Sequence, residues 1–183
     1  MKSAGIWIWG LHSVEACVEC HPERILEIQV ERDAKIGPDA RLRSLARQAG
    51  LKVSEVPRLP RFSEEARPQG VAARIRSFPV QSASDYFEGE SDEGAGQWVL
   101  LDRIQDPRNF GAILRSAAAF GVRGVFFGTR DQSPVTATVA VASAGQVFRI
   151  PLIEVSNLGT ICRRFEEAGS ALFTLDMGGR DLE

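Results

Sequence analysis

The stretch that decides the fold is WVLLDRIQDPRNFGAILRSAAAFGVRGVFFG, residues 98–128. It opens with an almost continuous apolar run, which is typical of a strand that is covered on both faces. Pro107 then suits the first turn of a helix, and Asp106 or Asn109 can cap the free N–H groups of that turn. The stretch therefore predicts a strand, a helix and a second strand, over residues 98–104, 109–120 and 123–128.

The predicted helix carries one arginine outside its apolar stripe. The stripe has the spacing of a helix that packs on a sheet, and it consists of Phe110, Ile113, Leu114 and Ala117. Arg115 lies off this stripe, one turn after Gly111, and Gly111 leaves room for another group to approach at a cost of up to about 1 kcal/mol in helix propensity. Two interpretations stay open on spacing alone: a capped crossover helix with a solvated arginine, or a functional site that contains Asn109 and Arg115.

The rest of the second half continues the alternation of strands and helices. It predicts a helix, a strand, a helix and a strand, over residues 136–148, 150–155, 158–169 and 171–177. Strands that alternate with helices of this length indicate βαβ crossovers and a parallel sheet, so we expect an α/β fold. Ligands of such sheets bind beyond the carboxyl ends of the strands.

The first 79 residues predict a separate small α/β/α domain. Its expected elements are helices at 11–20 and 40–50, a helical turn near 61–67, and strands at 25–32, 51–56 and 71–78. Residues 80–97 are rich in Ser, Gly, Asp and Glu, which is the composition of a solvated linker. We therefore expect domains at 1–79 and 98–183, joined by an acidic flexible linker at 80–97.

Charge and composition leave RNA as a possible partner and give no sign of a membrane. Residues 1–79 hold 13 basic and 10 acidic side chains, residues 80–97 hold five acidic and no basic ones, and 19 of the 22 basic residues of the chain are arginine. Arginine suits phosphate and stacks on bases. The arginines at the end of the first domain could follow an RNA backbone or be solvated surface: Arg61, Arg67, Arg74 and Arg76. No apolar run reaches the roughly 18 residues of a membrane span, and three cysteines fit a reducing compartment, so we expect a cytoplasmic protein.

The segment CVECH, residues 17–21, invites two metal interpretations. Its spacing is that of a c-type haem attachment site, and with His12 nearby it also suggests zinc. Haem attachment needs export, of which the sequence gives no sign, and zinc needs a second pair of ligands. We therefore expect two cysteines on a short helix and no metal.

The second half resembles the SpoU branch of the SPOUT-class RNA ribose 2'-O-methyltransferases. The matching pattern is a strand, then Asp-Pro-x-Asn-x-Gly-x-x-x-Arg-x-Ala, then a second strand, and it is met by Asp106, Pro107, Asn109, Gly111, Arg115, Ala117 and Gly121. The segment ASAGQVFRIPLIEVSNL is similar to the family's next one, through Ser143, Gly145 and Pro151. The N-terminal IWGLHSVEA and RPQGVAARI resemble the small RNA-binding domain of the branch that methylates a guanosine of large-subunit ribosomal RNA.

The resemblance implies transfer of a methyl group from S-adenosylmethionine to a ribose 2'-hydroxyl of ribosomal RNA. It assigns the central role to Arg115, with Asn109 beside it. A guanidinium stays protonated, so we expect Arg115 to hold the target phosphate and to stabilise the developing alkoxide, while Asn109 orients Arg115 or the ribose.

The resemblance also implies motifs that would lie beyond Glu183. In the family these form the α/β knot, most of the cofactor pocket and the homodimer face. We therefore expect a C-terminally truncated SPOUT domain that is inactive as given, with Leu175, Asp176 and Met177 as its part of the S-adenosylmethionine pocket. The alternative is a non-catalytic RNA-binding protein. A small-molecule methyltransferase is disfavoured by the additional N-terminal domain.

Overall fold

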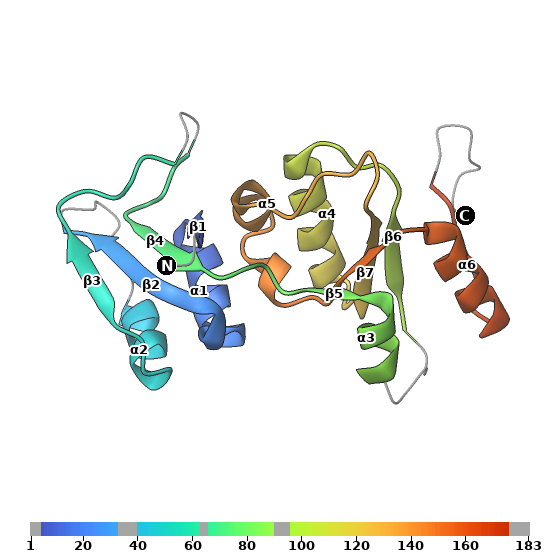
Figure 1. The fold of residues 1–183 in the computed structure, drawn as a ribbon, viewed down its shortest axis with the longest axis horizontal. Helices are drawn as coiled ribbons and strands as arrows, with labels where there is room; N and C mark the ends of the chain where they lie inside the picture. The colour runs from blue at the N-terminus through green and yellow to red at the C-terminus, as the bar shows by residue number, and fades with distance from the viewer. Residues whose placement is uncertain (1–4, 33–39, 63–65, 90–95, 176–183) are drawn as a thin grey trace.

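The structure, a computed structural model of the chain, describes residues 5–32, 40–62, 66–89 and 96–175. Two α/β units lie side by side along the long axis, each built on a four-stranded sheet (Figure 1). The elements of the first unit are β1 (Ile6–Trp9), α1 (Leu11–Cys20), η1 (Pro22–Arg24), β2 (Ile25–Glu31), α2 (Ala40–Gln48), β3 (Val53–Val56) and β4 (Val71–Ile75). Those of the second unit are β5 (Val80–Ser82), α3 (Ala83–Gly89), β6 (Trp98–Leu101), α4 (Pro107–Ala119), β7 (Gly124–Gly128), α5 (Ala137–Ala142), η2 (Gln146–Phe148), β8 (Leu152–Val155) and α6 (Leu158–Glu167).

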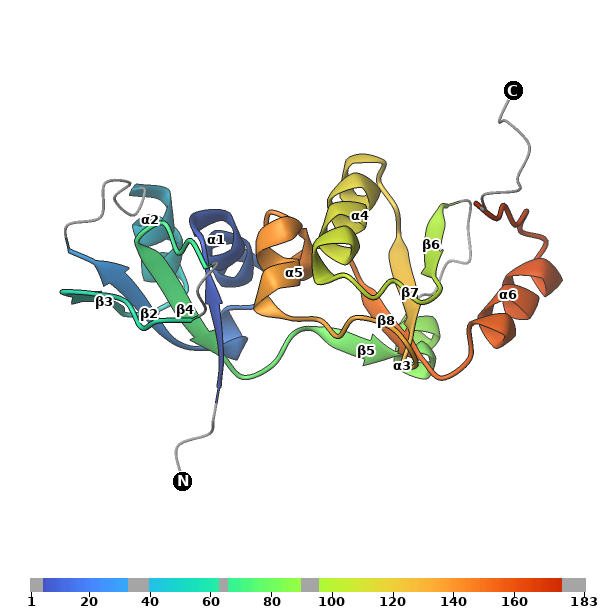
Figure 2. The same ribbon diagram turned by 90° about the horizontal axis from the view of Figure 1, so that it is seen from above.

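The first sheet has the order β1-β4-β2-β3, in which β4 is antiparallel to both neighbours and β3 is parallel to β2. Ile8 and Ile28 both lie opposite Ala73, and all three side chains are fully buried. Helices α1 and α2 lie on one side of this sheet (Figure 2). Burial of these apolar side chains against the two helices forms the core of the first unit.

Strand β1 was not predicted, because Ile6–Trp9 is apolar at every position and lacks the alternation of a half-buried strand. It forms nevertheless, because β4 offers it a free edge. The helical turn expected near 61–67 falls partly on residues 63–65, which lie outside the described residues, and the flanking positions are not helical.

The second sheet is parallel throughout, as predicted, with the order β5-β8-β7-β6. Successive residues of β7 point to opposite faces, so Val125 and Phe127 belong to the core on the side of α4 and α5. Phe126 belongs to a second core with Phe165 of α6 and Tyr86 of α3. Helices therefore cover both faces of this sheet.

The predicted linker at 80–97 is wrong for residues 80–89, which form strand β5 and helix α3. Tyr86 is buried and packs edge to face against Phe126. The Ser82 hydroxyl accepts from Asp85 N at 3.2 Å, as the side chain of an N-cap does, and donates to the Asp85 carboxylate at 2.8 Å. The prediction of a linker rested on the acidic composition of the segment and did not use this local hydrogen-bonding pattern. Residues 90–95 of the predicted linker lie outside the described residues.

Two further predictions in the second half need correction. The helix expected over 136–148 ends at Ala142, because Ala144 and Gly145 adopt φ values of 51° and 83°, and the chain continues as η2. The strand expected over 171–177 is not formed at 171–175, where no ladder hydrogen bonds pair the backbone and Phe173 is 83% exposed. Residues 176 and 177 lie outside the described part of the chain.

The two units share one continuous core, because α1 packs against α5 and η2. A Cβ atom on Gly145 would lie 2.5 Å from the His12 carbonyl oxygen and 2.8 Å from the Ala16 Cβ, so α1 approaches the second unit at backbone distance. Phe148 stacks on Phe78 with ring centroids 5.7 Å apart. The first unit is therefore docked on the second by closely fitting apolar groups.

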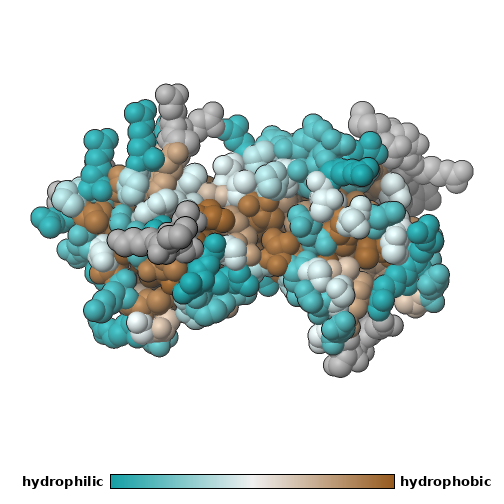
Figure 3. All heavy atoms as spheres, in the orientation of Figure 1, coloured by the Kyte–Doolittle hydropathy of each residue, from teal (hydrophilic) through white to brown (hydrophobic). Residues whose placement is uncertain are grey.

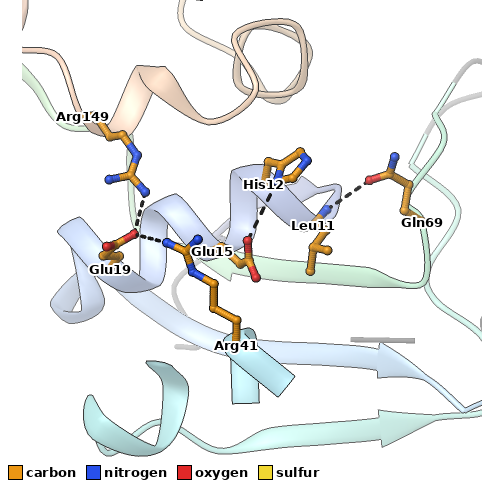
Figure 4. Close-up of polar contacts among 7 residues, drawn as sticks. All are labelled: Leu11, His12, Glu15, Glu19, Arg41, Gln69 and Arg149. Carbon is orange, nitrogen blue, oxygen red and sulfur yellow. Dashed lines mark hydrogen bonds and ion pairs between the residues drawn. The ribbon is translucent and has the colours of Figure 1, made fainter. Parts of the chain in front are cut away.

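Polar contacts surround this docking interface (Figure 4). Arg149 Nη2 donates to Glu19 Oε2 at 2.6 Å, and Arg41 Nη2 of α2 donates to the same oxygen at 3.3 Å. His21 Nε2 donates to the Phe148 carbonyl oxygen at 3.0 Å. The hydrogen bond from Arg149 is the first cause that holds the pKa of Glu19 below its ordinary value. Glu19 thus joins α1, α2 and the segment after η2.

Candidate functional site at the carboxyl edge of the parallel sheet

Helix α4 begins at the carboxyl edge of the parallel sheet, two residues earlier than predicted. Asp106 is its N-cap, with φ −80° and ψ 120°, and its Oδ1 accepts from Arg108 N at 2.8 Å. Pro107 occupies the first turn, where its missing N–H has no cost. Of the two capping residues that the sequence offered, the structure uses Asp106. Asn109 is therefore not needed as a cap.

Asn109 and Arg115 are both exposed side chains of α4. Neither forms a hydrogen bond or an ion pair with another residue of the described ranges. Arg115 follows Asn109 by six positions, which corresponds to about 9 Å along the helix axis and to different sides of the helix. The structure thus leaves both side chains available to a ligand, but it does not bring them into direct contact, as the assignment of Asn109 to orient Arg115 would require.

Gly111 is buried against helix α5 and does not leave room for a ligand. A Cβ at this position would lie 2.4 Å from the Ala142 Cβ and 2.9 Å from both Ser143 N and the Val139 carbonyl oxygen. The group that approaches is thus the backbone of the next helix. The prediction that Gly111 opens a space beside Arg115 is wrong, and its physical reason is the close packing of α4 on α5.

Two loops at the carboxyl edge are tied together by Gln132, which the sequence did not single out. Ile104 N donates to Gln132 Oε1, and Ser133 N donates to the Ile104 carbonyl oxygen, both at 2.8 Å. Arg103 and Asp131, on the same two loops, have positive φ values of 56° and 52°. Non-glycine residues with such values are uncommon and are concentrated at functional sites. The position of Asp102–Arg103 directly after a strand is the signal that could have found this region.

Of the residues predicted for the cofactor, only Leu175 belongs to the described part of the chain. Leu175 is 87% exposed, while Asp176 and Met177 lie outside the described residues, so their role stays a prediction. A pocket of about 580 Å³ lies between α3 and α6, on the sheet face opposite to α4. Its lining includes Phe87 and Arg164, whose guanidinium lies 3.9 Å from the centre of the Phe87 ring. This pocket therefore lies away from Asn109 and Arg115.

The CVECH segment forms the end of helix α1. Burial raises the pKa of the Cys17 thiol to about 12, and Cys20 is half-buried. His21 is engaged in the docking interface. Within the described ranges no group of three or more His, Cys, Asp or Glu side chains is arranged to hold a metal ion. No helix in this part of the chain is both long and apolar enough to cross a membrane.

Comparison with known families supports the resemblance noted in the sequence. Residues 97–183 match the SpoU rRNA Methylase family, and residues 7–81 match the family described as RNA 2'-O ribose methyltransferase substrate binding. The chain is 34% identical over 179 residues to the 23S rRNA (guanosine-2'-O-)-methyltransferase RlmB of Xanthomonas campestris pv. campestris. That alignment covers 96% of this chain and 72% of the relative.

Two solved structures share the fold. One is the SpoU methyltransferase AviRb from Streptomyces viridochromogenes in complex with AdoMet, with a TM-score of 0.65 at 20% identity, covering 92% of this chain and 62% of that one. The other is an AdoMet-bound rRNA methyltransferase from Sinorhizobium meliloti, with a TM-score of 0.59 at 22% identity, covering 90% and 58%. The chain thus spans about three fifths of the length of these proteins. Because the RlmB relative aligns with almost the whole chain and both halves match families of this kind, the chain belongs to the SpoU family of rRNA methylases.

Proposed function

We propose that this chain belongs to an enzyme that transfers a methyl group from S-adenosylmethionine to the 2'-hydroxyl of a guanosine in large-subunit ribosomal RNA. The observation that carries the proposal is the 34% identity to RlmB over 96% of the chain. It is supported by the position of Asn109, which is exposed in the first turn of α4 at the carboxyl edge of a parallel sheet, while Arg115 is exposed about 9 Å farther along the same helix. Ligands of such sheets bind at that edge. S-adenosylmethionine would supply the methyl group.

Arg115 would act on the RNA through its charge. A ribose 2'-hydroxyl is a poor nucleophile, and negative charge develops on its oxygen as the proton leaves. A guanidinium stays protonated in proteins, so Arg115 can hold the neighbouring phosphate and stabilise the developing alkoxide, and the proton passes to another acceptor. Asn109 lies more than one and a half turns before Arg115 on the helix and would contact the ribose or its phosphate directly.

The test is methyl transfer by the complete product of the reading frame that encodes this chain. The protein is incubated with 23S rRNA and methyl-labelled S-adenosylmethionine, and the modified position is mapped. Arg115→Ala should lower kcat by about 100-fold or more, which is typical for loss of one group that stabilises a developing oxyanion. Ser116→Ala changes an exposed neighbour on the same helix and should leave the rate unchanged.

The variants separate the possible outcomes. Methylation at the parental rate by Arg115→Ala would remove Arg115 from the mechanism. If the complete product binds RNA but neither binds S-adenosylmethionine nor transfers a methyl group, the enzyme hypothesis is refuted. The protein would then be a non-catalytic RNA-binding protein. The homodimer that the resemblance implies and the cytoplasmic location expected from the composition stay predictions, and sedimentation of the complete product tests the former.

A further inference from the structure

The connections that carry exposed arginines in the two units lie along one edge of the molecule. The connection between β3 and β4, and the loops that follow β6 and β7, all run along the upper edge in Figure 1, and they face the viewer in Figure 2. Figure 3, in the orientation of Figure 1, shows mainly hydrophilic residues along this edge above the second unit. We call the described residues of these segments, 57–62, 66–70, 102–108 and 129–136, the upper edge.

Arginine is the dominant charged residue of the upper edge. The exposed arginines are Arg58, Arg61 and Arg67 in the first unit and Arg103, Arg108 and Arg130 in the second. The acidic residues there are Asp102, whose carboxylate accepts from Arg103, Asp106, which caps α4, and Asp131. Glu64 and Glu65 belong to the same connection but lie outside the described residues. Arginines spread over two units along one edge form the kind of surface that contacts successive phosphates.

The docking interface holds the two groups of arginines at a fixed spacing. Gln69, at the end of the first connection, accepts a hydrogen bond from Leu11 N at 3.3 Å at the start of α1 (Figure 4). One residue later, the His12 carbonyl oxygen lies against Gly145 of the second unit. Farther along α1, Glu19 pairs with Arg149. The end of the first connection is thus linked to the second unit through the rigid helix α1.

We propose that the upper edge is one RNA-binding track, on which a single RNA segment contacts the arginines of both units at once. This inference rests on the proposed function, because it takes RNA as the partner. Contacts in both units then belong to one complex, and the docking interface sets the distance between them. A fixed spacing removes the conformational entropy that two loosely tethered units would lose when both bind one RNA.

The first test measures binding of fluorescent 23S rRNA fragments to the 183-residue chain by anisotropy, over a series of salt concentrations. Arg58→Ala removes a contact in the first unit and Arg130→Ala removes one in the second. Each phosphate contact contributes about 0.7–0.9 to the slope of log K against log salt, which corresponds to about five- to eightfold in affinity at 0.1 M salt. Arg47→Ala is the matched control, because Arg47 is an exposed arginine on α2, which lies at the lower edge in Figure 1.

We expect each chain to bind one RNA molecule. The RNA affinity should fall five- to eightfold in each of the two single variants and by about the product of the two factors in the double variant. The affinity of Arg47→Ala should be unchanged. Two RNA molecules per chain, each sensitive to one variant alone, would overturn the single track. Equal losses in Arg47→Ala and in the edge variants would overturn it as well. Failure of the parental chain to bind any rRNA fragment would also overturn the single track, whereas the proposed function fails only if the complete product does not methylate 23S rRNA, so the two failures are distinguishable.

The second test disturbs the spacing and leaves the arginines of the edge in place. Glu19→Arg turns the Glu19–Arg149 attraction into repulsion, and adding Arg149→Glu restores an attractive pair of opposite order. Glu19→Arg should lower the affinity for an RNA fragment that spans both units at least fivefold. Its affinity for a short oligonucleotide that reaches only one unit should not change. The double variant should bind the long fragment with the parental affinity. Equal affinities of all three proteins for the long fragment would contradict a spacing role. Circular dichroism confirms that each variant is folded.

Discussion

Replacement of Gly111 by alanine tests whether this glycine serves the packing of two helices. The new Cβ would lie 2.4 Å from the Ala142 Cβ and 2.9 Å from two backbone atoms of α5 and its C-cap residue Ser143, so α4 and α5 must move apart. Overpacking of a core costs about 1–3 kcal/mol, and we take the upper end because backbone atoms cannot rotate away. Alanine regains about 1 kcal/mol of helix propensity relative to glycine. The expected net loss is about 2 kcal/mol in the free energy of unfolding.

Urea denaturation of the 183-residue chain measures this loss. With a slope of about 2 kcal/mol per molar urea, the midpoint should fall by about 1 M. Gly89→Ala is the control, because Gly89 ends α3 with no heavy atom within 4 Å of the added Cβ, and it should be neutral or up to about 1 kcal/mol stabilising. If Gly111→Ala is as stable as the parent, the packing explanation is refuted, and the space beside Arg115 is again open to a ligand.

Three further predictions concern the cap, an ion pair and a thiol. Asp106→Ala should lower the free energy of unfolding by about 0.5–2 kcal/mol while Asp106→Asn keeps most of it, as measured by the same denaturation; equal losses would show that the cap is not used. Because Arg149 lowers the pKa of Glu19, the stability that this pair adds is present above the ordinary glutamate value of 4.5 and is lost as pH falls through the folded-state pKa. The stability difference between the parent and Arg149→Gln should therefore shrink below pH 4.5, and a constant difference would contradict the pairing. Cys17, with its pKa raised to about 12 by burial, should react with a thiol reagent at pH 8 more slowly than Cys162 and should become reactive in urea; mass spectrometry of the labelled chain decides this.

Regular elements with a strong apolar period were predictable, and elements formed by long-range contacts were not. The strands and the helix of residues 98–128 follow from apolar runs and a stripe of 3.6-residue period, although β6 is an edge strand and three of its four residues are half-buried. Strand β1 has no alternation, and its partner β4 lies more than 60 residues away in the chain, so local pattern contained too little information. Helix α3 was concealed by an acidic composition, although the Ser82–Asp85 spacing was a readable N-terminal signal.

The site was predictable in part for the same reason. Asp106 as a cap follows from local chemistry, and the structure uses it. The roles of Gly111 and Gly145 depend on which helix approaches each of them, and that is decided by the tertiary fold. A glycine in a sequence motif can leave space for a ligand or for a backbone. At Gly111 and at Gly145 the space is taken by the backbone of a neighbouring helix.

The residues that match the family pattern can be sorted by whether packing explains them. Those with a structural role are Asp106 and Pro107 at the helix start, Gly111 and Ala117 in the helix interface and core, Gly121 with a φ of 67° just after the helix, Ser143 and Gly145 at the break before η2, and Pro151, whose carbonyl accepts from Val125 N. Ser143 is fully buried, and its hydroxyl donates to the Ala140 carbonyl and accepts from Val147 N, which shapes the turn that presents Gly145 to α1. Asn109 and Arg115 remain: they are exposed, and no hydrogen bond, ion pair or cap among the described residues requires either residue type. Fold stability therefore gives no reason for an asparagine and an arginine at these positions, and both side chains are available for the proposed contacts with RNA.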